Sequence, residues 1–66
     1  MWNVEWEQET DGRWIAEIPV IPGAMTYGTT KEEAIRNVEV LALRVMTERI
    51  ERGEEVRELR GLFQAV

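Results

Sequence analysis

The sequence predicts a two-layered α+β fold in the order β-β-β-α-β, with a three-stranded antiparallel sheet, one long helix and a fourth strand. Three observations predict this class. Apolar and polar residues alternate along residues 2–9 and 14–18, as in half-buried strands. Prolines and glycines interrupt residues 19–28, where the chain has to turn. Apolar residues then recur every three or four positions over residues 34–50, as on one face of a helix.

The composition limits the kinds of protein this chain can be. A chain of 66 residues forms one domain, 1–66, with a small core. It contains no cysteine and no histidine, which excludes disulfides, the commonest metal ligands and the familiar nucleophile–base pairs. We therefore expect a protein that is not an enzyme and has no cofactor.

Charge and hydropathy narrow the range of partners. The formal charge of −5 disfavours direct binding to nucleic acid and favours a basic partner. No apolar run reaches the roughly 18 residues of a membrane span, and the N-terminus lacks the basic start and apolar block of a signal peptide. We expect a cytoplasmic protein with no membrane partner.

The first two strands form a hairpin whose register follows from the length of its turn. A two-residue Asp11-Gly12 loop pairs Trp6 with Glu17 and so mixes core with surface side chains. A three-residue loop over residues 10–12 instead pairs Trp6 with Ala16 and places the apolar residues on one face. We predict the three-residue loop, with Gly12 in the left-handed conformation that such loops need.

This register separates the side chains of the hairpin into two faces. The core face carries three tryptophans, which we expect to be buried beneath the helix: Trp2, Trp6 and Trp14. The other face carries an acidic row around one apolar residue, with Arg13 as its only basic side chain: Glu5, Glu7, Glu9, Ile15 and Glu17. A negative patch with an apolar centre favours docking of a positively charged protein. These five residues are the candidate partner-binding site, and the alternative is a solvated face with no partner.

A short third strand over residues 24–28 leads into the helix. Thr30 and Glu33 have the spacing of a capping box, and Gly53 is placed to end the helix in the left-handed conformation. Val40 and Leu43 lie off the apolar stripe, either as scattered surface residues or as a contact between subunits. Small domains without disulfides or metals often rely on oligomerisation, so we predict a homo-oligomer with these two residues at its contact.

The C-terminal segment, residues 56–66, fits both a helical period and a short strand. Gly61 disfavours a helix interior by about 1 kcal/mol. A fourth strand extends the sheet through a crossover, which is almost always right-handed. We predict Leu59–Ala65 as strand four.

The segment from Asp11 to Met46 resembles the signature of the HicB-like antitoxin family. The signature comprises an Asp-Gly turn, an aromatic residue, a strand ending in proline, a Pro-Gly turn, a short strand, and a helix opened by Glu-Ala. The matching positions are Asp11, Gly12, Trp14, Ala16, Pro19, Pro22, Gly23, Gly28, Thr30, Glu33 and Ala34. They cover about half of the chain.

The resemblance implies a partial RNase H-like fold and a function. Such proteins look like the neutralising halves of toxin–antitoxin pairs, which bind a small basic RNA-cleaving toxin protein. Larger family members add a C-terminal DNA-binding domain, and we expect a stand-alone domain without it. Two rival functions are a structural or regulatory homo-oligomer that binds no toxin, and a vestigial metal-dependent nuclease that uses the carboxylates.

Overall fold

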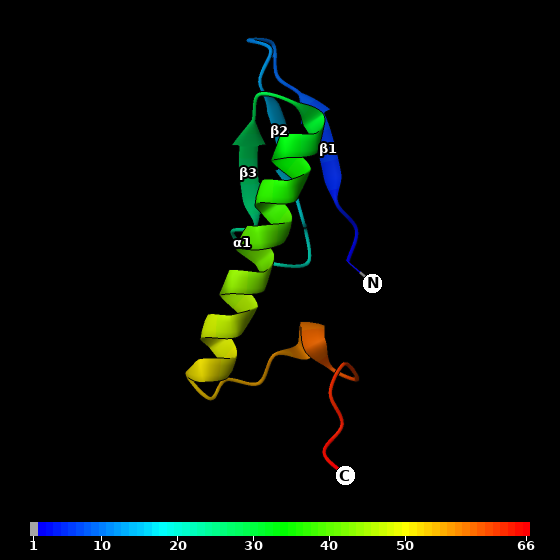
Figure 1. Cartoon of the computed structure of the whole chain (residues 1–66), viewed down its shortest axis with the longest axis vertical. Helices are drawn as coiled ribbons and strands as arrows, with labels where there is room; N and C mark the ends of the chain where they lie inside the picture. The colour runs from blue at the N-terminus through cyan, green and yellow to red at the C-terminus, as the bar shows by residue number, and fades with distance from the viewer. Residues whose placement is uncertain (1) are drawn as a thin grey trace.

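The computed structural model describes residues 2–66, which form three strands, a long helix and a short 3₁₀ helix. Strands β1 (Glu5–Gln8), β2 (Trp14–Glu17) and β3 (Met25–Gly28) form one antiparallel sheet in the order β1-β2-β3. Helix α1 (Lys31–Glu51) crosses one face of this sheet and extends past its end (Figure 1). The 3₁₀ helix η1 (Arg57–Leu59) follows. The predicted α+β class and the three-stranded antiparallel sheet are confirmed.

The hairpin has the predicted register. Trp6 lies opposite Ala16 in the β1–β2 pair. The amide of Glu9 donates to the carbonyl of Arg13 at 2.7 Å, which closes a loop over residues 10–12. Gly12 has a φ of 93°, the left-handed conformation that only glycine adopts without steric cost. Turn length therefore sets which side chains share a face.

Helix α1 begins and ends where the sequence predicts. The hydroxyl of Thr30 accepts from the amide of Glu33 at 3.1 Å. The carboxylate of Glu33 does not return to the Thr30 amide, as a capping box would have it, but accepts from the amide of Thr29 at 3.0 Å. At the other end Gly53 has a φ of 79° and donates to the carbonyl of Ile50, while Glu54 donates to that of Arg49. These two bonds are a Schellman motif, which satisfies the last carbonyls of the helix.

The core consists of small and medium side chains from the sheet, the loop before β3 and the inner stripe of α1. Its buried members are Ala16, Ile18, Ile21, Ala24, Ala34, Val38, Ala42 and Met46. They allow α1 to approach the sheet closely. A Cβ added to Gly28 would lie only 2.5 Å from the backbone nitrogen of Ala34, so this glycine is required for the approach of β3 to the first turn of α1. Two side-chain bonds fasten the same contact: Thr26 Oγ1 donates to the Ala34 carbonyl and Asn37 Nδ2 to the Tyr27 carbonyl.

The prediction that three tryptophans fill the core is wrong for Trp6. Trp2 and Trp14 are half-buried against the core, but Trp6 is 48% exposed. The reason is that α1 packs over β2 and β3 far more than over β1. The Trp6 ring lies at the margin of the helix, with its centroid 6.3 Å from that of Trp14 and 3.6 Å from Nζ of Lys31.

The predicted fourth strand is not confirmed. Residues 59–65 contain the end of η1, a turn at Gly61 and an irregular stretch. Leu59 packs against the core, and an Arg49–Glu58 ion pair of 3.4 Å ties η1 to the end of α1. Beyond Gly61 the chain leads away from the sheet (Figure 1) and is not paired with β1.

The resulting molecule is elongated. Its extents are 49 × 21 × 15 Å and its radius of gyration is 13.7 Å, against about 11 Å for a compact chain of this length. Leu62 and Phe63 are exposed. Within residues 2–66, no helix combines the length and the apolar character that crossing a membrane requires.

Candidate functional site

The face of the sheet opposite α1 brings together six side chains from all three strands. The register aligns them in two rows across the sheet, Glu5-Glu17-Met25 and Glu7-Ile15-Tyr27. We call these six residues the outer face. Because alternate residues of a strand point to opposite sides, the register that places the core residues under α1 also places these six away from it.

The outer face carries negative charge that no neighbour neutralises. Glu5, Glu7 and Glu17 are exposed, and none of them forms an ion pair within residues 2–66. Glu5 and Glu17 stand directly opposite each other on neighbouring strands, an arrangement of like charges that is mildly destabilising. The fold therefore retains an electrostatic cost that a positively charged partner would relieve.

Arg13, a basic residue beside this face, contacts Asp11 and the ring of Tyr27 but forms no ion pair with the glutamates of the outer face. Its Nε donates to Oδ2 of Asp11 at 2.8 Å, and its guanidinium lies 4.6 Å from the centroid of the Tyr27 ring. The amide of Arg13 donates to Asp11 Oδ1, and this bond, more than the side-chain contact, lowers the pKa of the Asp11 carboxyl. Arg13 thus stabilises the hairpin loop and leaves the glutamates unpaired.

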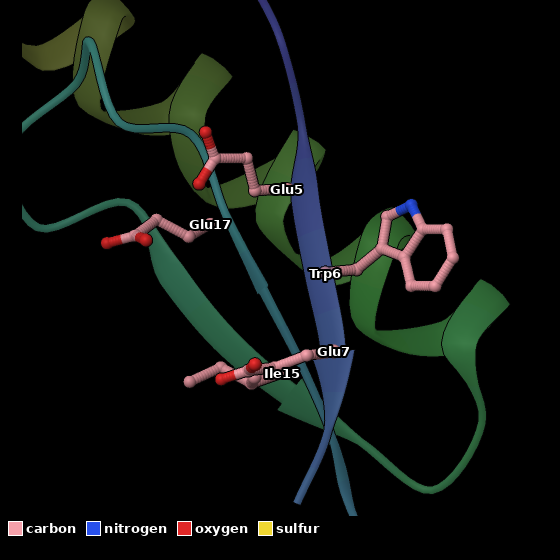
Figure 2. Close-up of a pocket in the computed structure, with 5 residues that line it drawn as sticks. All are labelled: Glu5, Trp6, Glu7, Ile15 and Glu17. Carbon is pink, nitrogen blue, oxygen red and sulfur yellow. The ribbon is translucent and has the colours of Figure 1, made fainter.

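The apolar part of the outer face lies beside the acidic part. Ile15 is half-buried, and Met25 and Tyr27 are 48% and 42% exposed. A shallow hollow of about 190 Å³ opens above Ile15 between the carboxylates of Glu5, Glu7 and Glu17. Figure 2 shows these four side chains on one side of β1, whereas the indole of Trp6, which also borders the hollow, leaves the strand on the other side. The hollow has room for one or two side chains of a partner.

Four of the five predicted partner-binding residues, Glu5, Glu7, Ile15 and Glu17, come together on the outer face. Glu9 lies one row further, at the loop end of the hairpin, and is half-buried. Met25 and Tyr27 were not predicted. They could have been predicted from the short third strand, because pairing this strand with β2 places Met25 opposite Glu17 and Tyr27 opposite Ile15.

The predicted self-association residues lie on the other side of the molecule. Val40 and Leu43 are exposed on α1, and Leu43 also borders a hollow lined by Trp2, Val4 and Ile18. They are separated from the outer face by the sheet and the helix together. The structure therefore offers two distinct surfaces, one acidic and one on α1.

The outer face combines negative charge with apolar surface. Its functional groups are carboxylates, a thioether and a phenol. Among residues 2–66, no three or more acidic side chains are grouped so that they could hold a metal ion. The chain matches no protein-family model, no curated protein and no solved structure.

Proposed function

We propose that this chain is a non-enzymatic binding module of the HicB-like antitoxin type, which sequesters a small basic RNA-cleaving toxin protein through its outer face. One observation carries the proposal: three exposed carboxylates that form no ion pair within residues 2–66 surround a half-buried isoleucine, with an exposed methionine and tyrosine beside it. The resemblance of residues 11–46 to the HicB-like signature supplies the class of partner.

Charge complementarity explains how such a partner would be recognised. The chain has a formal charge of −5 and a pI near 4.6. A basic protein is attracted over a Debye length of about 10 Å, which raises the rate of encounter. Contact of its apolar side chains with Ile15, Met25 and Tyr27 then slows dissociation. The proposal places the protein in the cytoplasm, where an RNA-cleaving partner finds its substrate.

We also propose that the partner-bound protein adopts the partial RNase H-like layout, in which a fourth strand joins the sheet. In the free structure the outer edge of β1 is open: Glu5, Glu7 and Glu9 form their backbone bonds with β2, so the amide and carbonyl of Trp6 point away from the sheet. Residues 59–65 would add to this edge as the fourth strand. Hydrogen exchange at the Trp6 amide tests this step, because a strand added to this edge would slow it on binding, and unchanged exchange would contradict the step.

The direct experiment is co-expression with the product of the adjacent gene, followed by titration calorimetry of the purified pair. The proposal expects a small basic protein that binds and whose RNA cleavage is inhibited. It also expects affinity to fall as salt rises, because exposed charges are screened. An adjacent product that is basic and cleaves RNA, yet does not bind, would contradict the proposal.

A matched pair of variants locates the contact. Glu7→Lys reverses a charge on the outer face, and Glu39→Lys makes the same change on an exposed position of α1. We expect Glu7→Lys to weaken binding about tenfold or more, which corresponds to about 1.4 kcal/mol, and Glu39→Lys to change it little. Equal effects of the two variants would show that overall charge, and not the outer face, determines affinity.

A further inference from the structure

The outer edge of β3 presents the backbone groups of two residues. In an antiparallel pair, residues that bond to the neighbouring strand alternate with residues whose amide and carbonyl point away from it. The amide of Ile18 donates to the Ala24 carbonyl at 2.9 Å, so in the β2–β3 register Thr26 also faces β2. Met25 and Tyr27 therefore turn their amides and carbonyls outward, away from the sheet.

Two of these four groups already have partners. The side-chain amide of Asn37, on α1, donates to the Tyr27 carbonyl at 3.0 Å. The Met25 amide donates to the Gly23 carbonyl, also at 3.0 Å. Within residues 2–66 the Met25 carbonyl and the Tyr27 amide have no hydrogen-bond partner. A strand added at this edge would form two backbone bonds with these residues instead of four.

The outer edge of β1 has no such cover. The Glu9 amide donates to the Arg13 carbonyl, so the β1–β2 register turns the amides and carbonyls of Trp6 and Gln8 outward. Within residues 2–66 these four groups form no hydrogen bond. The sheet therefore has one open edge and one edge that is half occupied.

The residues of β3 do not themselves protect its edge. The strand reads Met-Thr-Tyr-Gly, without the prolines and charged side chains that commonly keep exposed edges from pairing. The Met25 and Tyr27 side chains are 48% and 42% exposed. Protection of this edge therefore depends on the groups that cover its backbone.

We infer that Asn37 blocks the β3 edge and prevents β3 of a second copy from pairing with it. With its carbonyl free, Tyr27 would present both the amide and the carbonyl that two facing residues of an antiparallel pair exchange. The close approach of β3 to the first turn of α1 at Gly28 brings the short Asn37 side chain within reach of that carbonyl.

The block also determines where a strand can join the sheet. An added strand is directed to β1, where the backbone groups of Trp6 and Gln8 are open. The inference does not depend on the proposed function. If both are correct, residues 59–65 meet a single open edge when they join the sheet.

Two variants that each remove one hydrogen bond between β3 and α1 test the inference. Asn37→Ala removes the bond to the Tyr27 carbonyl at the edge. Thr26→Val is the matched control, because it removes the bond from Thr26 Oγ1 to the Ala34 carbonyl on the helix side of the strand. Asn37 is exposed and alanine is the best helix former, so we expect Asn37→Ala to fold, and circular dichroism checks both variants.

Sedimentation equilibrium from about 10 µM to 1 mM compares the two variants with the wild type. We expect Asn37→Ala to self-associate at least tenfold more tightly than the wild type and Thr26→Val to behave as the wild type does. Association through any other surface is common to all three proteins and cancels in this comparison. In Asn37→Ala alone, hydrogen exchange at the Tyr27 amide should slow as the concentration rises, because pairing at the edge protects this group.

A measurement on the wild type needs no variant. The side-chain amide protons of Asn37 should exchange more slowly than those of Asn3, which is exposed and forms no side-chain hydrogen bond within residues 2–66. Equal exchange at the two asparagines would overturn the inference. So would an Asn37→Ala chain that associates no more tightly than the wild type, or equal association of Asn37→Ala and Thr26→Val.

Discussion

Replacing Gly28 by alanine tests the contact that positions α1 on the sheet. The added Cβ would lie 2.5 Å from the backbone nitrogen of Ala34, 3.0 Å from its Cα and 3.1 Å from the carbonyl carbon of Glu33. Ordinary contact between such atoms begins near 3.5 Å, so the first turn of α1 would have to move by about 1 Å. All three obstructing atoms are backbone, and no change of rotamer relieves them.

The surroundings of Gly28 resist such a movement. The Ala34 amide donates to the Thr30 carbonyl at 3.1 Å, and the Ala34 carbonyl accepts from Thr26 Oγ1 at 2.9 Å. Overpacking of a close contact costs about 1–3 kcal/mol, and the lower entropy of the unfolded alanine chain returns about 0.4–1 kcal/mol. We expect a net loss of about 1–2 kcal/mol. This is a large part of the roughly 3–10 kcal/mol expected for a chain of this length.

Urea unfolding followed by far-UV circular dichroism measures the effect. The midpoint should fall while the slope m stays unchanged, and Tm should drop by about 4–16 °C. Ala34→Gly should not rescue the variant, because the clash is with backbone atoms. An alanine at position 28 that leaves stability unchanged or raises it would refute the reasoning.

Gly23→Ala measures the cost of backbone conformation without the cost of a steric clash. Gly23 has a φ of +82°, and a Cβ there would meet no atom within 4 Å. Gly23→Ala therefore costs only the left-handed conformation, about 1–2 kcal/mol before the same entropic gain. Because this cost is conformational, Gly23→Asn should destabilise the protein less than Gly23→Ala does, since asparagine tolerates the left-handed conformation better. At position 28, where φ is not positive, asparagine should be worse than alanine.

Three further predictions concern the caps, the loop and the core. Thr30→Ala removes the oxygen that caps α1 and should lower the free energy of unfolding by about 1 kcal/mol. Thr47→Ala, in the middle of the exposed face of α1, is the control and should change Tm little. Equal losses for the two variants would contradict the capping role. The Asp11 carboxyl has a lowered pKa because it accepts from the Arg13 amide, so its contribution to stability is present above the unfolded pKa near 4 and is lost as pH falls through the lower folded value. The Tm difference between wild type and Asp11→Asn should therefore shrink below about pH 4, and a difference that grows on acidification would show the opposite sign. Met46→Ala empties a buried site and should cost about 2–5 kcal/mol in urea unfolding; a loss below about 0.5 kcal/mol would mean that the side chain is not packed.

The two surfaces described here arise from the way the secondary structure is layered. The sheet has α1 on one side only, so its other side is exposed together with Glu5, Glu7 and Glu17. Likewise α1 has the sheet on one side only, which leaves Val40 and Leu43 exposed. A domain with one helical layer and one sheet layer has an exposed face on each layer. The charge on each face distinguishes them: the acidic face of the sheet suits a basic partner, and the face of α1 with Val40 and Leu43 suits self-association.

The sequence alone determined which residues of the hairpin share a face and where α1 begins and ends. Turn length fixes the register of the hairpin, and this register places Glu5, Glu7, Ile15 and Glu17 on one face, as the structure confirms. The caps of α1 at Thr30 and Gly53 follow from local spacing in the same way. Each of these features depends on interactions between residues close together in the chain, and a periodic pattern records them directly.

Only the tertiary structure decided how deeply each residue is buried. Periodicity placed Trp6 on the core side, but it does not state how far α1 lies from β1; the close approach at Gly28 draws the helix towards β3 and leaves the indole at the margin. Met25 and Tyr27 joined the outer face through pairing with β2, and residues 59–65 remained outside the sheet because η1 is held to the end of α1. These outcomes depend on contacts between distant segments and on the relative positions of whole elements, for which a single sequence carries no local signal.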